Sequence, residues 1–247
     1  MSGHSKWATT KRHKAVIDAK RGKMFSTLSK DISLAARDGG GDVNFNAKLR
    51  VIVQKAKEAN MPAENIKKAI QKGTGELPGA TIEELTYEGY AVGGVGLIVE
   101  VTTDNKNRAA SEVRSTLTKC GGNLAGTGAL MFNFQRMGQF FISKGETTED
   151  RLMEIALDAG ADDIRVDDEG FEVLCPISAY YALEQAMANA KIKCLSSEIA
   201  YVPNSLVHIA DAALAAKILK TVEKLEELDD VKNVFANFNI DDSIDIG

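Results

Sequence analysis

The order of strands and helices expected between residues 139 and 202 restricts the fold of this chain more than any other feature. Runs rich in β-branched and aromatic residues alternate there with stretches of helical periodicity. In chain order we predict a strand, a helix, two strands, a helix and a strand, at Gln139–Ser143, Glu149–Ala159, Asp163–Val166, Phe171–Cys175, Ala179–Ala190 and Lys193–Val202. This βαββαβ order is typical of a ferredoxin-like domain, which we expect to span residues 136–203.

A second set of predicted elements lies on both sides of this segment. They are strands at Tyr87–Tyr90, Val95–Thr103, Ala129–Phe134 and Val231–Asn237, and helices at Asn107–Lys119 and Asp211–Leu228. The last helix and strand have no partner nearby in the chain, so we expect them to complete the earlier set. Residues 77–135 and 204–247 would then form one discontinuous α+β domain, into which the ferredoxin-like domain is inserted.

The first 76 residues are predicted to hold a basic arm followed by a helical bundle. Helical periodicity is present at Lys23–Arg37, at Phe45–Ala59 and from Pro62 to Gly73. One face of the second helix would be apolar, with Phe45, Leu49, Ile52, Val53 and Ala56. Short connections between amphipathic helices are typical of a bundle. The predicted fold class is therefore α+β, an N-terminal helical bundle followed by two α/β sandwich-like domains, one of them ferredoxin-like and inserted in the other.

Charge is divided unevenly along the chain. The whole sequence holds 30 basic and 35 acidic residues, a net charge of −5. Residues 1–80 hold 16 basic and 7 acidic residues, whereas residues 81–247 hold 14 and 28. Such asymmetry indicates that the N-terminal part meets a polyanion. The outer faces of the second and third predicted helices add to this basic character with Lys48, Arg50, Lys55, Lys57, Lys67, Lys68 and Lys72.

The stretch Gly3–Lys23 is the strongest candidate for binding. It holds seven basic residues against one acid, and the only tryptophan of the chain. Lysine and arginine release counterions from nucleic acid, and an aromatic ring can stack on an unpaired base. The alternative is a solvated tail in which the tryptophan only anchors the arm. The predicted nucleic-acid-binding residues of this stretch are Lys6, Trp7, Lys11, Arg12, His13, Lys14, Lys20, Arg21 and Lys23.

A second candidate contact lies at residues 102–108, between a predicted strand and a predicted helix. Free backbone N–H groups at a helix N-terminus can receive an anion. Asp104 or Asn105 could instead be the N-cap of that helix, which the usual capping preferences favour. Lys106 and Arg108 complete the predicted nucleic-acid-binding set.

The residues give little support for a membrane-spanning, metal-binding or catalytic protein. No apolar run approaches the roughly 18 residues that span a bilayer. The cysteines, Cys120, Cys175 and Cys194, form no CxxC pair, which favours a reducing cytosol and predicts no zinc site. Each of the acidic pairs at 162–163, 167–168 and 229–230 lies at a turn or at the end of a predicted element, where carboxylates are commonly solvated. We therefore predict no metal, no cofactor and no catalytic residue.

Several motifs then give the chain a resemblance to a known family. They are MSGHSKWATTKRHKAVIDAKRGKMF (1–25), GGGD (39–42), ANMPAENIKKAIQKGTGE (59–76), TYEGYAVGGVGLIVEVTTDNKNRAASEVR (86–114), GGNLAGTGAL (121–130) and LDDVKNVFAN (228–237). On these motifs the chain resembles the YebC family, which includes the mitochondrial translational activator of cytochrome oxidase subunit one. Residues 11–14 reorder the usual Lys-His-Arg-Lys, and Val43 stands where many members have proline.

The resemblance implies a three-domain cytoplasmic protein that binds nucleic acid and regulates gene expression. It favours a non-enzymatic, DNA-binding transcriptional regulator. The alternative is a ribosome-associated translation factor that binds ribosomal RNA and relieves stalling at proline-rich stretches. No helix carries a face of residues suited to base edges, so the residues themselves do not choose between DNA and RNA. Two rival classes of function remain. One is an enzyme that works in a cleft between the acidic domains, and the other is a protein-interaction scaffold.

Overall fold

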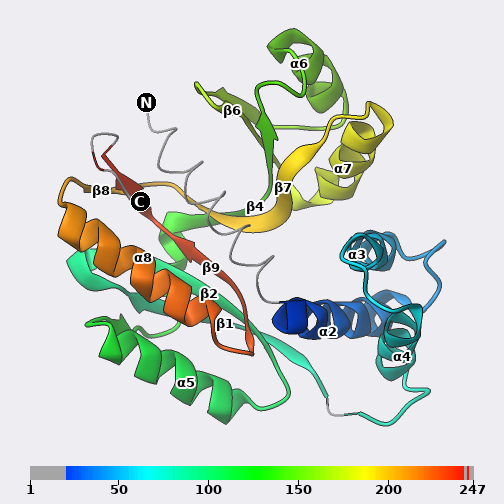
Figure 1. Cartoon of the computed structure of the whole chain (residues 1–247), viewed down its shortest axis with the longest axis horizontal. Coiled ribbons are helices and arrows are strands. Elements are labelled where there is room, and N and C mark those ends of the chain that lie inside the picture. Colours follow the sequence, from blue (N-terminus) through cyan, green and yellow to red (C-terminus); the bar gives the residue numbers. More distant parts are fainter. Residues whose placement is uncertain (1–20, 80, 242–243, 245–247) are drawn as a thin grey trace.

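The computed structural model describes residues 21–79, 81–241 and 244. Its N-terminal part is a bundle of three helices, α2 (Arg21–Gly39), α3 (Ala47–Glu58) and α4 (Ala63–Gly73) (Figure 1). The bundle core is formed by buried aliphatic side chains, among them Ile32, Ala35, Leu49, Ala56 and Ala69. The three helices predicted for this region are confirmed.

A hydrogen bond and a glycine set the spacing inside the bundle. The Ser33 hydroxyl donates to the carbonyl of Ala69 at 2.8 Å, which joins α2 to α4. At Gly73, an added Cβ would lie 2.2 Å from the carbonyl oxygen of Ser33. The two helices can approach this closely only because position 73 has no side chain.

One expectation for the bundle is wrong. Phe45 does not lie on the buried face of α3, because the helix begins two residues later, at Ala47, and Phe45 is 90% exposed. The physical reason is the N-cap. The side chain of Asn46 accepts the backbone N–H of Leu49 at 3.0 Å, which fixes the start of the helix after the phenylalanine.

The first sheet has four antiparallel strands in the order β3-β1-β2-β9. Helices α5 (Lys106–Lys119) and α8 (Ala212–Glu226) lie together against it (Figure 1). The strands are β1 (Glu83–Tyr90), β2 (Gly96–Thr103), β3 (Asn123–Leu124) and β9 (Val231–Ala236). Because β9 pairs with β2, the expectation that the last strand completes the earlier set is confirmed. The core beneath both helices includes Leu97, Val99, Val113, Leu117 and Ile218.

The predicted strand at Ala129–Phe134 is wrong. Met131–Asn133 form a 3-10 helix, η2, and the strand starts only at Phe134. The buried carboxylate of Glu88 accepts the backbone N–H groups of Gly128, Leu130 and Met131, at 2.5, 2.5 and 3.2 Å. These donors are therefore bound by a side chain from β1 rather than by a neighbouring strand.

The second large sheet is antiparallel, in the order β5-β6-β4-β7. Its strands are β4 (Phe134–Ser143), β5 (Asp163–Val166), β6 (Gly170–Cys175) and β7 (Cys194–Pro203), and its helices are α6 (Glu149–Asp158) and α7 (Tyr180–Asn189). This strand order and its two helices confirm the predicted ferredoxin-like arrangement. The domain boundaries stay a prediction.

Four smaller elements complete the fold. Short β8 (Val207–Ile209) and β10 (Phe238–Ile240), neither of them predicted, pair in parallel. The 3-10 helices η1 (Val92–Gly94) and η3 (Ile177–Ala179) precede β2 and α7. Among the residues described, no helix is both long and apolar enough to cross a membrane.

Candidate nucleic-acid interface

Most of the predicted binding residues precede the described part of the chain. Lys6, Trp7, Lys11, Arg12, His13, Lys14 and Lys20 lie outside the described residues. Arg21 is the first residue of α2, and Lys23 follows on the same helix. The binding role predicted for these residues therefore stays a prediction.

Lys23 is placed at the junction between the bundle and the first sheet. Its ammonium group donates to the backbone carbonyl of Glu226 and, at 2.7 Å, to that of Leu228. Glu226 is the last residue of α8, and Leu228 lies two residues beyond it. The C-terminal end of a helix carries unsatisfied acceptors and a partial negative charge. Lys23 thus helps to hold α2 against α8.

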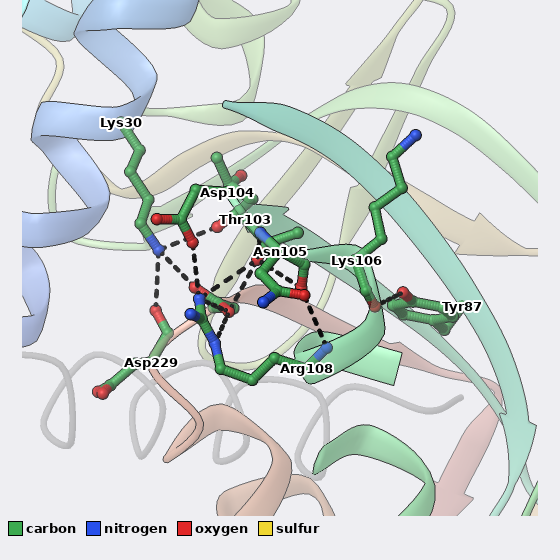
Figure 2. A network of polar contacts seen from close by, with 10 residues as sticks. Lys30, Tyr87, Thr103, Asp104, Asn105, Lys106, Arg108 and Asp229 are labelled. Atoms are coloured by element: carbon green, nitrogen blue, oxygen red, sulfur yellow. Dashed lines mark hydrogen bonds and ion pairs between the residues drawn. The ribbon is translucent and has the colours of Figure 1, made fainter. Parts of the chain in front are cut away.

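A buried carboxylate organises the same junction. Asp230, which precedes β9, keeps only 6% of its side chain exposed. It accepts hydrogen bonds from the ammonium group of Lys30 at 2.9 Å, the hydroxyl of Thr103 at 2.9 Å and the guanidinium of Arg108 at 2.6 Å. Figure 2 shows Lys30 approaching this network from α2, opposite Arg108 from α5. Burial alone would raise the pKa of Asp230, but the three donors outweigh burial and hold the pKa below its ordinary value.

Arg108 and Lys106 lie at the start of α5 and are paired with carboxylates of the protein itself. Arg108 also contacts Asp104 at 2.8 Å, and its hydrogen bonds with Asp230 and Asp104 raise its pKa. The ammonium group of Lys106 lies 2.6 Å from Glu83. Arg108 still keeps 45% of its side chain exposed. A phosphate reaching these cations would therefore compete with carboxylates that are already in place.

The capping alternative for this turn is confirmed. Asn105 is the N-cap of α5, and its side chain accepts the backbone N–H of Arg108 at 3.1 Å. Its own backbone N–H is bound by the hydroxyl of Thr103 at 2.9 Å. Side chains therefore already occupy donors that an anion at this helix N-terminus would use.

The junction is also a cleft of about 650 Å³ between the bundle, the linker and the turn before α5. Its basic lining residues are Lys23, Lys30, Arg37, Lys72 and Arg108, and its acidic ones are Asp104, Asp229 and Asp230. Two of the groups that line it have shifted pKa values: the pKa of Asp230 is lowered and the pKa of Arg108 is raised. Both shifts favour the charged forms, whereas a general acid or base needs a pKa near the working pH. The charged groups of Asp230 and Arg108 are thus held in an ion pair with one another.

The outer surface of the bundle carries the remaining basic residues. Lys57 on α3 and Lys67 on α4 are exposed, and their ammonium groups form no ion pair within the described part of the chain. Lys68 lies 3.9 Å from Glu64 and Lys48 lies 3.7 Å from Asp38, both distances typical of weak surface pairs.

Lys55 differs from the other lysines of the bundle. It lies 3.5 Å from Glu184 and donates to the carbonyl of Ser197 at 3.1 Å, which joins α3 to the second large sheet. The sequence placed it on the open face of α3. The outward-facing charge is therefore smaller than the sequence indicates.

The environment predicted for Asp230 is wrong as well. The pair at 229–230 was expected to be solvated at a turn, but Asp230 is buried and accepts three donors from elsewhere in the fold. Nothing in the sequence assigned a role to Lys30, because it is one of several polar residues on the predicted first helix.

In the described residues, no group of three or more His, Cys, Asp or Glu side chains could hold a metal ion.

An α+β protein with a basic helical domain beside two antiparallel sheets is thus the class that the structure defines. One family model, described as the TACO1/YebC protein N-terminal domain, matches residues 5–76. A second, described as the TACO1/YebC second and third domain, matches residues 82–238. The chain therefore belongs to the TACO1/YebC family.

Relatives are similar along the whole chain. A protein of Opitutus terrae with the name "Probable transcriptional regulatory protein" is 54% identical over 99% of this chain and 98% of its own length. A protein of Syntrophobacter fumaroxidans with the same name is 46% identical over the same shares. The crystal structure of a conserved hypothetical protein from Aquifex aeolicus, 42% identical, superposes with a TM-score of 0.83 and covers 92% of this chain and 94% of its own. These names support a regulatory role, and the superposition supports the α+β fold.

Proposed function

We propose that this chain is a non-enzymatic, cytoplasmic regulator of gene expression that binds nucleic acid through its basic arm and helical bundle. The single observation that carries the proposal is the division of charge, 16 basic against 7 acidic residues in the first 80 positions. A negative body would otherwise be repelled by a phosphate polymer. The names of the relatives add support for regulation.

The favoured form of this proposal is a DNA-binding transcriptional regulator, and the alternative is a ribosome-associated factor that binds ribosomal RNA. The two differ in what the protein binds in cells. A transcriptional regulator shows sequence preference on duplex DNA. A ribosomal factor co-sediments with ribosomes after treatment with DNase. Crosslinking in cells, followed by sequencing of the bound RNA and DNA, separates them.

The dependence of binding on salt tests the common part of the proposal. Each phosphate contact contributes about −0.9 to the log–log salt slope on duplex. The triple variant K11A/R12A/K14A should therefore lower affinity and flatten the slope by roughly 2 to 3. The matched control is K217A/K220A/K224A, which removes three exposed lysines from α8 in the acidic part of the chain. Equal slopes for the wild type and the arm variant would remove the arm from the proposal.

A further inference from the structure

Phe45 is the most exposed of the large apolar side chains in the described residues. It keeps 90% of its surface in water, whereas Phe140 in the ferredoxin-like core is fully buried. Burying a phenylalanine side chain removes apolar surface from water and stabilises a fold. The bundle gains none of this from Phe45.

The connection that carries Phe45 is firmly built. Asn46 is buried, and its amide group donates to the carbonyls of Ala35 and Gly40, both at 2.8 Å. Its side-chain oxygen caps α3 at Leu49. At Gly39 an added Cβ would lie 2.7 Å from the amide nitrogen of Asn46, so the chain passes close beneath that side chain. One residue after Phe45, the backbone is therefore anchored to α2 and α3.

The residues before Phe45 are fixed as well. The carboxylate of Asp42 accepts the backbone N–H of Asn44 at 2.8 Å, and its carbonyl accepts the N–H groups of Phe45 and Asn46. Arg50 reaches back from α3 and donates to the carbonyls of Val43 at 3.1 Å and Asn44 at 3.4 Å. A side chain held between two such anchors is presented outward by the structure, and its exposure is not the result of a loose end.

The connection that carries Phe45 is polar, and basic residues lie at both of its ends. Arg50 donates to the carbonyls of Val43 and Asn44, whereas Arg37 and Lys48 share the carboxylate of Asp38, at 3.2 and 3.7 Å. Figure 1 shows the α2–α3 connection at the outer edge of the bundle, away from both large sheets. No large apolar neighbour on this connection shares the exposure of Phe45. A lone ring among cations is unlike the apolar patches at which proteins dock.

We propose that Phe45 is a base-stacking residue that receives one unpaired nucleotide. The inference rests on the proposed function, because it assumes that the bundle meets nucleic acid. A phenyl ring has no hydrogen-bonding group, so it offers a flat π-face that accepts any base. The neighbouring cations hold the phosphates on either side. A base inside a duplex is not available to the ring, and the interaction therefore selects single-stranded segments, loops or bulges.

Direct binding measurements test this proposal. The full chain is titrated into a labelled short oligouridylate and, separately, into a labelled blunt RNA duplex, and fluorescence anisotropy is recorded. Stacking on one base is worth about 1–3 kcal/mol, so F45A should weaken binding to the single strand about 5- to 150-fold. Affinity for the duplex and the salt slope should stay within twofold of the wild type. F132A removes another exposed phenylalanine and should leave both affinities unchanged.

Two further variants identify the kind of contact. F45W keeps a flat aromatic face and should bind the single strand at least as tightly as the wild type. F45L keeps an apolar side chain without the π-face and should bind as weakly as F45A. Full affinity of F45L for the single strand would overturn stacking in favour of a plain apolar contact. Because the side chain is exposed, all four variants should unfold at the wild-type temperature.

The outcomes separate this inference from the proposed function. If the wild type binds both probes and F45A binds them equally well, the stacking role is overturned while nucleic-acid binding stands. If the wild type binds neither RNA probe at low salt and does not bind a DNA duplex of the same length either, both proposals fail together. Selective loss of binding to the single strand in F45A supports both.

Discussion

Lys30 of α2 and Asp230 ahead of β9 form a 2.9 Å ion pair that joins the helical bundle to the first sheet. Beside it, a second pair reverses the polarity, with Asp31 of α2 lying 2.8 Å from Lys232 of β9. Lys30 and Asp31, which are adjacent on α2, thus meet Asp230 and Lys232, which carry opposite charges and lie two positions apart. This arrangement favours one pairing at the junction, because exchanging the partners would bring like charges together.

Truncating Asp230 should destabilise the fold. In D230A the donors of Lys30, Thr103 and Arg108 lose a buried acceptor, and we expect a loss of about 2–3 kcal/mol in the free energy of unfolding. Urea denaturation followed by circular dichroism measures it. The control is D229A, since the neighbouring carboxylate is exposed and Lys30 contacts only its backbone carbonyl. Equal losses in the two variants would contradict the role of Asp230 as the shared acceptor.

The same carboxylate predicts a pH dependence of stability. The donors hold the pKa of Asp230 below its ordinary value of 3.8 in the folded state. A lowered pKa means that its contribution is fully present above pH 3.8 and is lost as pH falls through the folded value. The wild type should therefore exceed D230N in stability at about pH 6, and the difference should shrink below about pH 4. Urea titrations at a series of pH values test this, and a constant difference down to about pH 2 would refute it.

The pair of Asp31 and Lys232 predicts a different mutational pattern. Burial raises the pKa of Asp31 against the opposing effect of Lys232, so the carboxylate is costly to leave alone. K232M should cost about 2 kcal/mol, below the roughly 3–5 of a fully buried pair, because Lys232 keeps 27% of its side chain exposed. The double variant D31L/K232M should recover most of this loss. A double variant as unstable as the sum of its single variants would contradict the pairing.

The close approach of α2 and α4 predicts that Gly73 does not accept a side chain. In G73A the new Cβ would meet the carbonyl of Ser33, and we expect a loss of about 1–3 kcal/mol. G79A is the matched control, because the nearest atom to its new Cβ would be an atom of the flexible side chain of Lys72 at 3.7 Å. Thermal unfolding compares them. A G73A protein as stable as G79A would mean that the helices can separate at little cost.

The exposed lysines of the bundle predict an effect on binding without an effect on stability. Removing Lys57 and Lys67 as K57A/K67A should flatten the log–log salt slope on duplex by about 2, at roughly 0.9 for each phosphate that is no longer neutralised. The thermal midpoint should not change, because neither ammonium group has a partner in the described part of the chain. K217A/K220A on α8 is the control and should bind like the wild type. Equal slopes in all three proteins would exclude the bundle from the interface.

The elements that local pattern predicted well are those with a clear period. The helices of the bundle, α5, α8 and most elements of the βαββαβ run were predicted within a few residues of their observed bounds, whereas β4 begins at Phe134, five residues before its predicted start at Gln139. The failures come from side chains whose hydrogen bonds the pattern does not reveal. Glu88 binds the backbone of the segment expected to be a strand at Ala129–Phe134, which forms a turn and the 3-10 helix η2 instead, and Asn46 moves the start of α3 past Phe45. Neither effect can be read from the spacing of apolar residues.

At the candidate site, too, the sequence predicts some features and leaves others to the tertiary structure. Composition alone locates the excess of positive charge in the first 80 residues. It does not tell which of those charges the protein uses for itself. Lys23 binds a carbonyl 205 positions away, and Lys55 binds the second large sheet. Lys106 and Arg108 look available in the sequence, yet each lies against a carboxylate of the fold.

The sequence by itself determined where most of the helices and strands lie, how they are ordered and at which end the positive charge gathers. These properties are local or additive, since they depend on the period of apolar residues and on the count of ionised groups. Tertiary structure alone decided which cations face outward and which are paired, and that Phe45 is presented to solvent. Those outcomes depend on acceptors and anchors that folding brings from distant positions, and their energies exist only once the elements have packed.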